Sequence, residues 1–244
     1  MTQIESLREI INQSQRIVFF GGAGVSTESN IPDFRSETGI YNEKQKKYPY
    51  PPEVMLSHSF YENNPEEFFD YYFNKMIYKD AKPNKAHLAL AKLEREGKLR
   101  AVITQNIDGL HQMAGSKNVL ELHGSVHRNY CQECNQFYDL NAMLKMADGV
   151  PKCSCGGIIK PDVVLYEESL DDGTISNSIN EIASCDCLIV GGTSLAVYPA
   201  AGLIRYFNGK NLVIINKEIT PYDNMATLII KGKIGEVLSQ VVDL

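Results

Sequence analysis

A glycine-rich segment follows the first long apolar run of the chain. The run RIVFFGG occupies residues 16–22, and the segment GGAGVSTESNIPDFR continues to residue 35. Gly22 and Gly24 permit a tight turn that brings the backbone close to a pyrophosphate, which the N–H groups of a following helix attract. Thr27 replaces the third glycine of the usual dinucleotide fingerprint. The segment therefore predicts a nucleotide site, and the alternative is a close-packed turn that binds nothing.

The loop at the end of this segment argues against one class of nucleotide enzyme. A hydride-transfer dehydrogenase carries an acidic residue at the end of its second strand, whereas this chain runs instead into IPDFR, residues 31–35. Asp33, Phe34 and Arg35 place an acid, an aromatic ring and a planar cation together. They belong either to a ligand site or to a capped turn with a buried ring and a surface ion pair.

A second polar cluster, TQNIDGLHQ at residues 104–112, ends the next apolar run. Gln105, Asn106 and Asp108 can hydrogen-bond an amide and ribose hydroxyls at the carboxyl edge of a parallel sheet, where such folds bind ligands. The alternative is that these residues cap a helix that begins near Asp108. Their position at a strand end favours a role in the site.

His123 follows the alternating apolar residues of VLELHGSVH and precedes a glycine. A single histidine is more often structural than catalytic, but this one is expected at an exposed strand end. With an ordinary pKa near 6.5, roughly three quarters of it is neutral at pH 7 and can accept a proton. These properties suit a general base.

Four cysteines form two close pairs. Cys131 and Cys134 are spaced C-x2-C, and eighteen residues later Cys153 and Cys155 form C-x-C. Two pairs of thiolates match a closed tetrahedral zinc site, which is structural rather than catalytic. The second pair is one residue shorter than the usual C-x-x-C, and His127 is an alternative ligand.

Apolar, β-branched runs are the elements that would position these residues. The runs at 16–22, 100–106, 187–194 and 211–216 suit central strands of a parallel sheet that is buried on both faces. Helical patterns at 86–99 and 198–207 alternate with them. The expected fold is therefore α/β, with a doubly wound, Rossmann-like parallel sheet.

Two stretches interrupt the alternation of strands and helices. Residues 31–83 are aromatic and contain the helical stretch EEFFDYYFNKMIY, and residues 125–160 are rich in Cys and Gly. The predicted division is a nucleotide-binding domain of residues 1–30, 84–124 and 161–244, a helical and loop insertion of residues 31–83, and a zinc-binding module of residues 125–160.

Composition limits the partners and the compartment. The 244 residues carry a formal charge of −6, which argues against direct nucleic-acid binding because phosphate contacts require clustered cations. The polar amino-terminal stretch and the lack of any run of about 20 apolar residues predict no membrane association. We expect a cytoplasmic protein, and in a reducing compartment clustered cysteines are metal ligands before they are disulfides.

Taken together, five motifs resemble those of the sirtuin (Sir2) family of bacterial type, in order and spacing. They are GAGVSTESNIPDFR, TQNIDGLH, LHG, GGTSL at residues 191–195, and the strand-end IN at residues 215–216. The resemblance covers nearly the whole chain. It implies an NAD-dependent protein-lysine deacetylase with zinc as a second bound group, and acetylated-lysine proteins or peptides as partners.

The resemblance also implies a role for each motif residue. The catalytic base would be His123, and the zinc ligands would be Cys131, Cys134, Cys153 and Cys155. The NAD phosphates would contact Ala23, Gly24 and Thr27, and the loop beside nicotinamide would contain Phe34 and Arg35. The carboxamide pocket would be formed by Asn106, Ile107 and Asp108, and the nicotinamide ribose would contact Gln105. The adenosine half would contact Thr193, Ser194, Asn216, Lys217 and Lys233.

The implied reaction begins when the acyl oxygen of the substrate lysine attacks the ribose carbon that carries nicotinamide. His123 would then deprotonate a ribose hydroxyl, and water would complete the transfer to yield lysine and O-acyl-ADP-ribose. Two other functions would use the same pocket. One is a mono-ADP-ribosyltransferase, and the other is an NAD-sensing module without turnover, in which a base at residue 123 has no purpose.

Three departures from the family pattern concern the substrate side. Asn30 stands where many sirtuins have Gly, and the pair Tyr166–Glu167 replaces the usual Phe–Gly. Sirtuins that favour acidic acyl groups carry a Tyr and, three residues later, an Arg on the helix within residues 66–78. Our alignment puts Phe73 and Met76 there and predicts an acetyl preference. A shift by one residue would put Tyr72 and Lys75 there instead.

Overall fold

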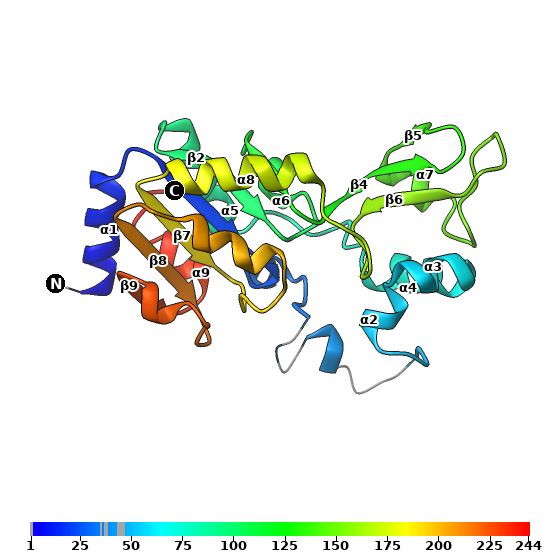
Figure 1. The fold of residues 1–244 in the computed structure, drawn as a ribbon, viewed down its shortest axis with the longest axis horizontal. Helices are drawn as coiled ribbons and strands as arrows, with labels where there is room; N and C mark the ends of the chain where they lie inside the picture. The colour runs from blue at the N-terminus through cyan, green and yellow to red at the C-terminus, as the bar shows by residue number, and fades with distance from the viewer. Residues whose placement is uncertain (1, 35, 37–38, 43–46) are drawn as a thin grey trace.

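Six parallel strands form the central sheet of the larger of two lobes in the computed structural model, which describes residues 2–34, 36, 39–42 and 47–244 (Figure 1). The strands lie in the order β3-β2-β1-β7-β8-β9. Their bounds are Ile17–Gly21 for β1, Leu99–Thr104 for β2, Val119–Glu121 for β3, Cys187–Gly191 for β7, Asn211–Asn216 for β8 and Leu228–Lys231 for β9. The strand order reverses between β1 and β7, and in such sheets the ligand crevice lies at this reversal.

Both faces of the sheet are covered, which explains why its strands are apolar throughout. In β1, Ile17 and Phe19 pack into one core cluster, while Val18 and Phe20 pack into another on the opposite face. The first cluster includes residues of α1 (Gln3–Gln13), α5 (Lys85–Arg95) and α9 (Ile234–Leu238). The second includes residues of α8 (Asp172–Ser184) and η3 (Ala200–Tyr206). The predicted doubly wound α/β fold is confirmed.

Asn84 connects the covering helix α5 to the glycine-rich segment. Its side-chain oxygen accepts a hydrogen bond from the Ala86 N–H at 2.8 Å and so begins the helix. Its amide nitrogen donates to the Val25 carbonyl at 2.8 Å and to the Ser29 hydroxyl at 2.9 Å. One capping residue therefore also holds η1 (Ala23–Ser29), the 3-10 helix that follows β1.

The smaller lobe combines the two predicted insertions around one core. Its sheet has the antiparallel order β5-β4-β6, formed by Phe137–Tyr138, Gly124–Cys131 and Ile159–Val163. Its helices are α2 (Pro52–Met55), α3 (His58–Asn63), α4 (Pro65–Lys75) and α7 (Leu140–Leu144). Phe68 and Tyr72 of α4 share a core cluster with Val126 of β4 and Ile159 of β6. The two stretches, distant in sequence, therefore pack as a single body (Figure 1).

The remaining short elements are η2 (Ile40–Asn42), α6 (Leu110–Met113) and η4 (Asp223–Met225). The strand predicted to end at His123 ends at Glu121, and β4 begins at Gly124, so His123 lies in the turn between the two lobes. Gly124 has a φ of 74°, and a Cβ there would collide with the Asp162 carbonyl of β6. Only glycine lets the chain turn into the small sheet directly after His123.

Candidate active site

A cavity of about 950 Å³ lies between the lobes at the carboxyl edge of the parallel sheet. Its wall in the larger lobe comes from the residues that follow β1, β2, β7 and β8. Its wall in the smaller lobe includes residues of α4 and the segment after β6. Its volume is in the upper range of small-molecule and cofactor pockets. The carboxyl edge of the parallel sheet and the boundary between the lobes therefore enclose the same cavity.

Two glycine-bearing loops touch at the floor of this cavity. The Gly24 N–H donates to the Gly192 carbonyl at 2.8 Å, which links the loop after β1 to the loop after β7. A Cβ on Gly24 would lie 2.8 Å from both the Cα and the carbonyl oxygen of Gly192. Larger residues would force these loops apart. The floor is therefore shaped to let a ligand lie against bare backbone.

Ser26 connects the two polar motifs that the sequence singled out. Its hydroxyl donates to the Asp108 carboxylate at 2.6 Å and accepts from the Asn106 amide at 3.1 Å. The other carboxylate oxygen of Asp108 accepts from the Leu110 N–H at 2.9 Å, at the start of α6. Asp108 thus lines the cavity and also accepts from the first N–H of α6, although the N-cap position itself is Gly109.

Gln105 joins the ends of β2 and β7. Its side-chain amide donates to the Thr193 hydroxyl at 3.1 Å, and its backbone N–H donates to the Gly21 carbonyl at 3.0 Å. The Thr193 hydroxyl also accepts from the Leu195 N–H at 3.2 Å. Every polar atom in this chain of contacts is neutral, so its geometry does not depend on pH.

His123 faces the cavity with a defined tautomer. Its Nδ1 lies 2.9 Å from the Gln105 carbonyl oxygen. Because a carbonyl only accepts, Nδ1 carries the proton and Nε2 keeps a free lone pair. Burial lowers the pKa of His123 below its ordinary 6.5, and the bond to Gln105 partly opposes this shift. The imidazole is therefore neutral at pH 7 and able to accept a proton.

The described residues predicted for the site all lie around this cavity. Its lining includes Ala23, Gly24, Thr27, Phe34, Gln105, Asn106, Ile107, Asp108, His123, Thr193, Ser194, Asn216, Lys217 and Lys233. Arg35 lies outside the described residues. The structure brings together positions that are more than 200 residues apart in the chain. Which ligand atoms each residue contacts stays a prediction.

Sequence reasoning missed Ser26 and left two registers open for α4. Ser26 lies between Gly24 and Thr27, so its place in the motif was the available signal. Tyr72 and Lys75 of α4 line the cavity, and so does Met76, which follows α4 directly. Phe73 is absent from the described lining. Phe73 instead stacks on Phe69, with ring centroids 6.0 Å apart. The cavity lining therefore contains both residues of the alternative register, Tyr72 and Lys75, and Met76 of the first one.

The end of the cavity at α4 is more polar than the pairing of Phe73 with Met76 predicts. The Tyr72 side chain is buried, and its hydroxyl has no hydrogen-bond partner among the described residues. Burial of the phenol also raises the pKa of Tyr72, so it stays protonated. Asn30, the other departure noted above, adopts the left-handed conformation with φ 63°, as expected for an Asn in place of Gly.

The four predicted metal ligands form a separate cluster in the smaller lobe. Their sulfur atoms all lie within 4.8 Å of one another. The Sγ of Cys131 is 3.4 Å from that of Cys155, and the Sγ of Cys134 is 3.6 Å from that of Cys153. Zinc–sulfur bonds of about 2.3 Å in a tetrahedron require sulfur atoms about 3.8 Å apart. The cluster therefore fits zinc with the four cysteines as its ligands, and the alternative ligand His127 is not needed.

The described part of the chain contains no helix that is both long and apolar enough to cross a membrane.

The Sir2 family model matches residues 22–199. A protein of Clostridium acetobutylicum named NAD-dependent protein deacetylase is 62% identical over 243 residues, which are 99% of each chain. A protein of the same name from Clostridium perfringens is 63% identical over 243 residues, again 99% of each.

Solved structures give the same result. One described as "Structural Basis for the Mechanism and Regulation of Sir2 Enzymes" matches with a TM-score of 0.88 and 42% identity, covering 99% of this chain and 96% of the other. One described as "Sir2 bound to acetylated peptide" matches with a TM-score of 0.84 and 38% identity, covering 99% and 97%. The fold, the ordered motifs around the cavity and these relatives agree, and the chain belongs to the Sir2 family.

Proposed function

We propose that this chain is an NAD-dependent protein-lysine deacetylase that moves the acyl group from lysine to ADP-ribose and releases nicotinamide. The observation that carries the proposal is the placement of His123. A neutral imidazole of fixed tautomer lines the same cavity as the glycine floor and the side chains of Gln105 and Asn106. The relatives named NAD-dependent protein deacetylase support the same activity.

The residues divide the proposed reaction among them. The glycine floor and Thr27 receive the NAD phosphates, while Asn106, Ile107 and Asp108 hold the carboxamide end. Gln105 receives the nicotinamide ribose, and Thr193, Ser194, Asn216, Lys217 and Lys233 receive the adenosine half. Phe34 and Arg35 belong to the loop beside nicotinamide, where Phe34 excludes water. Bound NAD supplies the ribose that accepts the acyl group.

His123 supplies the proton transfer. Its Nε2 lone pair takes the proton of a ribose hydroxyl, while the Nδ1–H bond to Gln105 holds the ring in place. General bases of this kind contribute about 10²- to 10⁴-fold to the rate. In the smaller lobe, zinc on Cys131, Cys134, Cys153 and Cys155 would hold the structure and take no part in the chemistry.

The substrate is an acylated lysine in a protein or peptide. Sir2 structures described as bound to an acetylated or a propionylated peptide support this class. The peptide would lie between the lobes as an added strand, near Val164 and residues 191–197. A net charge of −6 argues against nucleic acid as a partner. The free cysteines suit the reducing cytoplasm, which we propose as the compartment.

The domain division follows from the same reasoning. Residues 1–30, 84–124 and 161–244 would form the NAD-binding domain, except that residue 124 at the start of β4 and residues 161–163 at the end of β6 belong to the sheet of the smaller lobe. Residues 31–83 and 125–160 would supply the substrate-side insertion and the zinc module.

One experiment separates this proposal from its rivals. The protein is incubated with NAD and an acetyl-lysine peptide, and nicotinamide, free-lysine peptide and O-acetyl-ADP-ribose are quantified. The expected result is equal amounts of the three products, and no release of nicotinamide and no O-acetyl-ADP-ribose when the unacetylated peptide replaces the acetylated one. Transfer of labelled ADP-ribose to protein without deacetylation would instead indicate a mono-ADP-ribosyltransferase. NAD binding without any nicotinamide release would indicate a sensing module.

A further inference from the structure

Glu167 adopts a backbone conformation that costs energy for its residue type. Its φ is 75°, in the left-handed region that favours glycine. The residue belongs to the segment of residues 164–168 after β6, which lines the cavity in the smaller lobe. A strained residue that persists at a ligand-lining position points to a role for its side chain.

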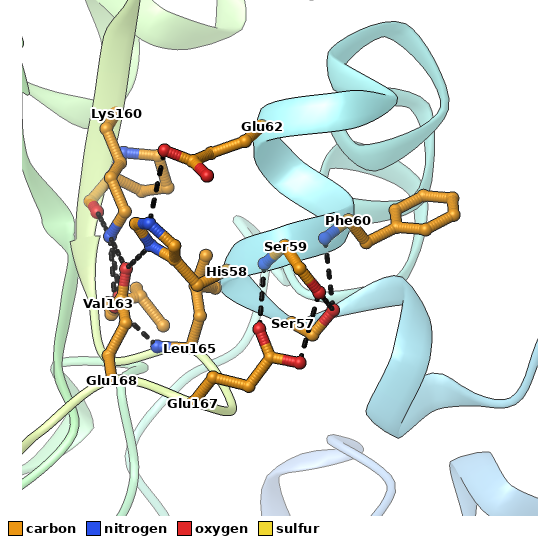
Figure 2. A network of polar contacts seen from close by, with 11 residues as sticks. Ser57, His58, Ser59, Phe60, Glu62, Lys160, Val163, Leu165, Glu167 and Glu168 are labelled. Atoms are coloured by element: carbon orange, nitrogen blue, oxygen red, sulfur yellow. Dashed lines mark hydrogen bonds and ion pairs between the residues drawn. The ribbon is translucent and has the colours of Figure 1, made fainter.

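The Glu167 side chain reaches across to the start of α3. One carboxylate oxygen accepts from the Ser59 N–H at 2.9 Å, and the other accepts from the Ser59 hydroxyl at 3.0 Å (Figure 2). The backbone of the neighbouring Tyr166 also contacts the residues around the start of α3. Its N–H donates to the Leu56 carbonyl at 3.0 Å, and its carbonyl accepts from the His58 N–H at 2.9 Å. We call these contacts between residues 166–168 and residues 56–59 the clasp.

Glu168 adds an ionic part to the clasp. Its carboxylate lies 2.8 Å from the His58 Nδ1 and 3.1 Å from the Lys160 Nζ, and it accepts from the Leu165 N–H at 2.8 Å (Figure 2). The bond to Glu168 raises the pKa of His58, and the nearby carboxylate of Glu62 acts in the same direction. These contacts close a turn of the segment and hold it against α3.

The other end of the segment touches the proposed base. The Val164 N–H donates to the His123 carbonyl at 3.0 Å. The Tyr166 hydroxyl hydrogen-bonds the Tyr41 hydroxyl, and the Tyr41 ring meets the Phe34 ring edge-on at 5.7 Å. Residues 164–168 therefore connect α3, the loop after Phe34 and His123. A segment with these three attachments is the substrate-side wall of the cavity.

We propose that Glu167 is a positioning residue for the acylated peptide. Its bonds to Ser59 hold residues 164–168 in the binding conformation before the peptide arrives, so that binding does not have to order them. Glu167 acts through the segment backbone and not through contact with the reacting atoms. The inference rests on the proposed deacetylase function, because it names the determinant of peptide affinity in that same cavity.

The first test is Glu167→Gly, which keeps the left-handed backbone accessible and removes the carboxylate. The expected result is a rise of about threefold to tenfold in the KM for an acetyl-lysine peptide, with kcat within about twofold of the native value. The control is Glu66→Gln on the exposed side of α4, which should change neither parameter. Unchanged KM for Glu167→Gly overturns the inference.

The second test distinguishes positioning from direct contact with the peptide. Ser59→Ala removes the hydroxyl partner from a residue outside the described cavity lining. It should raise KM by about twofold alone and add nothing in the Glu167→Gly background, because paired residues are not additive. Two results would show that Glu167 does not act through Ser59. One is that Ser59→Ala raises KM as much in the Glu167→Gly background as in the native protein, and the other is that Ser59→Ala alone leaves KM unchanged. If Glu167→Gly fails to fold, Glu167→Asn tolerates the same φ with a shorter side chain.

Amide hydrogen exchange tests the effect of Glu167 on the segment without relying on enzyme turnover. In the ligand-free protein, Glu167→Gly should speed exchange of the Val164, Leu165 and Tyr166 amides and leave β1 and β2 unchanged. If the native protein releases no nicotinamide with any acyl peptide, the proposed function fails while faster exchange still supports the clasp. If the native protein is active and exchange and KM are both unaltered, the clasp inference alone is wrong.

Discussion

The two lobes hold their sides of the cavity by different means. In the larger lobe, most of the contacts are backbone or neutral, as in the Gly24–Gly192 hydrogen bond and the Gln105–Thr193 pair. In the smaller lobe and at its junction, many are ionic. Arg128 of β4 pairs with Glu121, the last residue of β3, at 2.6 Å and with Asp162 of β6 at 2.7 Å, and 39% of the Arg128 side chain is exposed.

The difference has a physical consequence for each half. Buried neutral hydrogen bonds are insensitive to pH and salt, so the larger lobe keeps the cofactor edge in one geometry. The pairs in and beside the smaller lobe are charged, and salt screens them where side chains such as Arg128 and Asp162 reach the solvent, so their strength depends on pH and on salt. We therefore expect changes in the larger lobe to affect catalysis most and changes in the smaller lobe to affect peptide binding most.

The largest effect on activity is expected from replacing the proposed base of the larger lobe. His123→Ala should lower kcat/KM for an acetyl-lysine peptide by about 10²- to 10⁴-fold and leave NAD affinity and thermal stability nearly unchanged. Because burial lowers the pKa of His123, the native enzyme should keep its neutral base through pH 7. Activity should fall only as the pH drops through that lowered pKa, below about 6.5. Native turnover by the variant, or a loss of activity through protonation of His123 with its midpoint above pH 6.5, would contradict the assignment.

A smaller effect on chemistry is expected from the metal cluster. Cys131→Ser should release zinc and speed amide exchange in β4 and β6, since structural zinc contributes about 10–16 kcal/mol in small peptides. Peptide KM should rise while NAD affinity changes little, because the NAD-side contacts lie in the other lobe. Metal analysis of the reduced native protein should find one zinc per chain. If no zinc is found in the native protein, or if amide exchange in Cys131→Ser is unchanged, the cluster is not a structural zinc site.

The smallest expected effect concerns the acyl group. The native enzyme should prefer acetyl-lysine over succinyl-lysine peptides, but only moderately, because Lys75 lies at the cavity and Lys lacks the planar two-donor fork of Arg. Lys75→Met should lower kcat/KM for the succinyl peptide about tenfold more than for the acetyl peptide, since an ionic hydrogen bond is worth about 1.5–3 kcal/mol. Native succinyl turnover that equals or exceeds acetyl turnover would show that α4 selects for acidic acyl groups.

Much of the fold and of the cavity could be predicted from the order of residues. The apolar runs that end in Gly21, Thr104 and Gly191 are parallel strands, as predicted. Because parallel strands end at the same edge, the polar residues after them had to meet there. The spacing of the cysteines likewise predicted the sulfur cluster, since two short-range pairs need only one fold-back of the chain to meet.

Other features could not be predicted because they depend on how separate segments pack. Periodicity identified a helix near residues 66–78 but left its rotation open by one residue. Packing of Phe73 against Phe69 keeps Phe73 out of the described cavity lining, which contains Tyr72, Lys75 and Met76. The strand before His123 was expected to reach it. Its end at Glu121 reflects the turn at Gly124 into the small sheet.

By itself the sequence determined the parallel sheet, the polar edge at its strand ends and the four-sulfur cluster, since each depends on local spacing and on one rule of strand direction. The tertiary structure decided that two insertions share one core, that Ser26 bonds Asp108, and that Glu167 reaches Ser59. Those contacts join residues about 80 to 110 positions apart. No local pattern encodes such distances, because they follow from the packing of whole elements against one another.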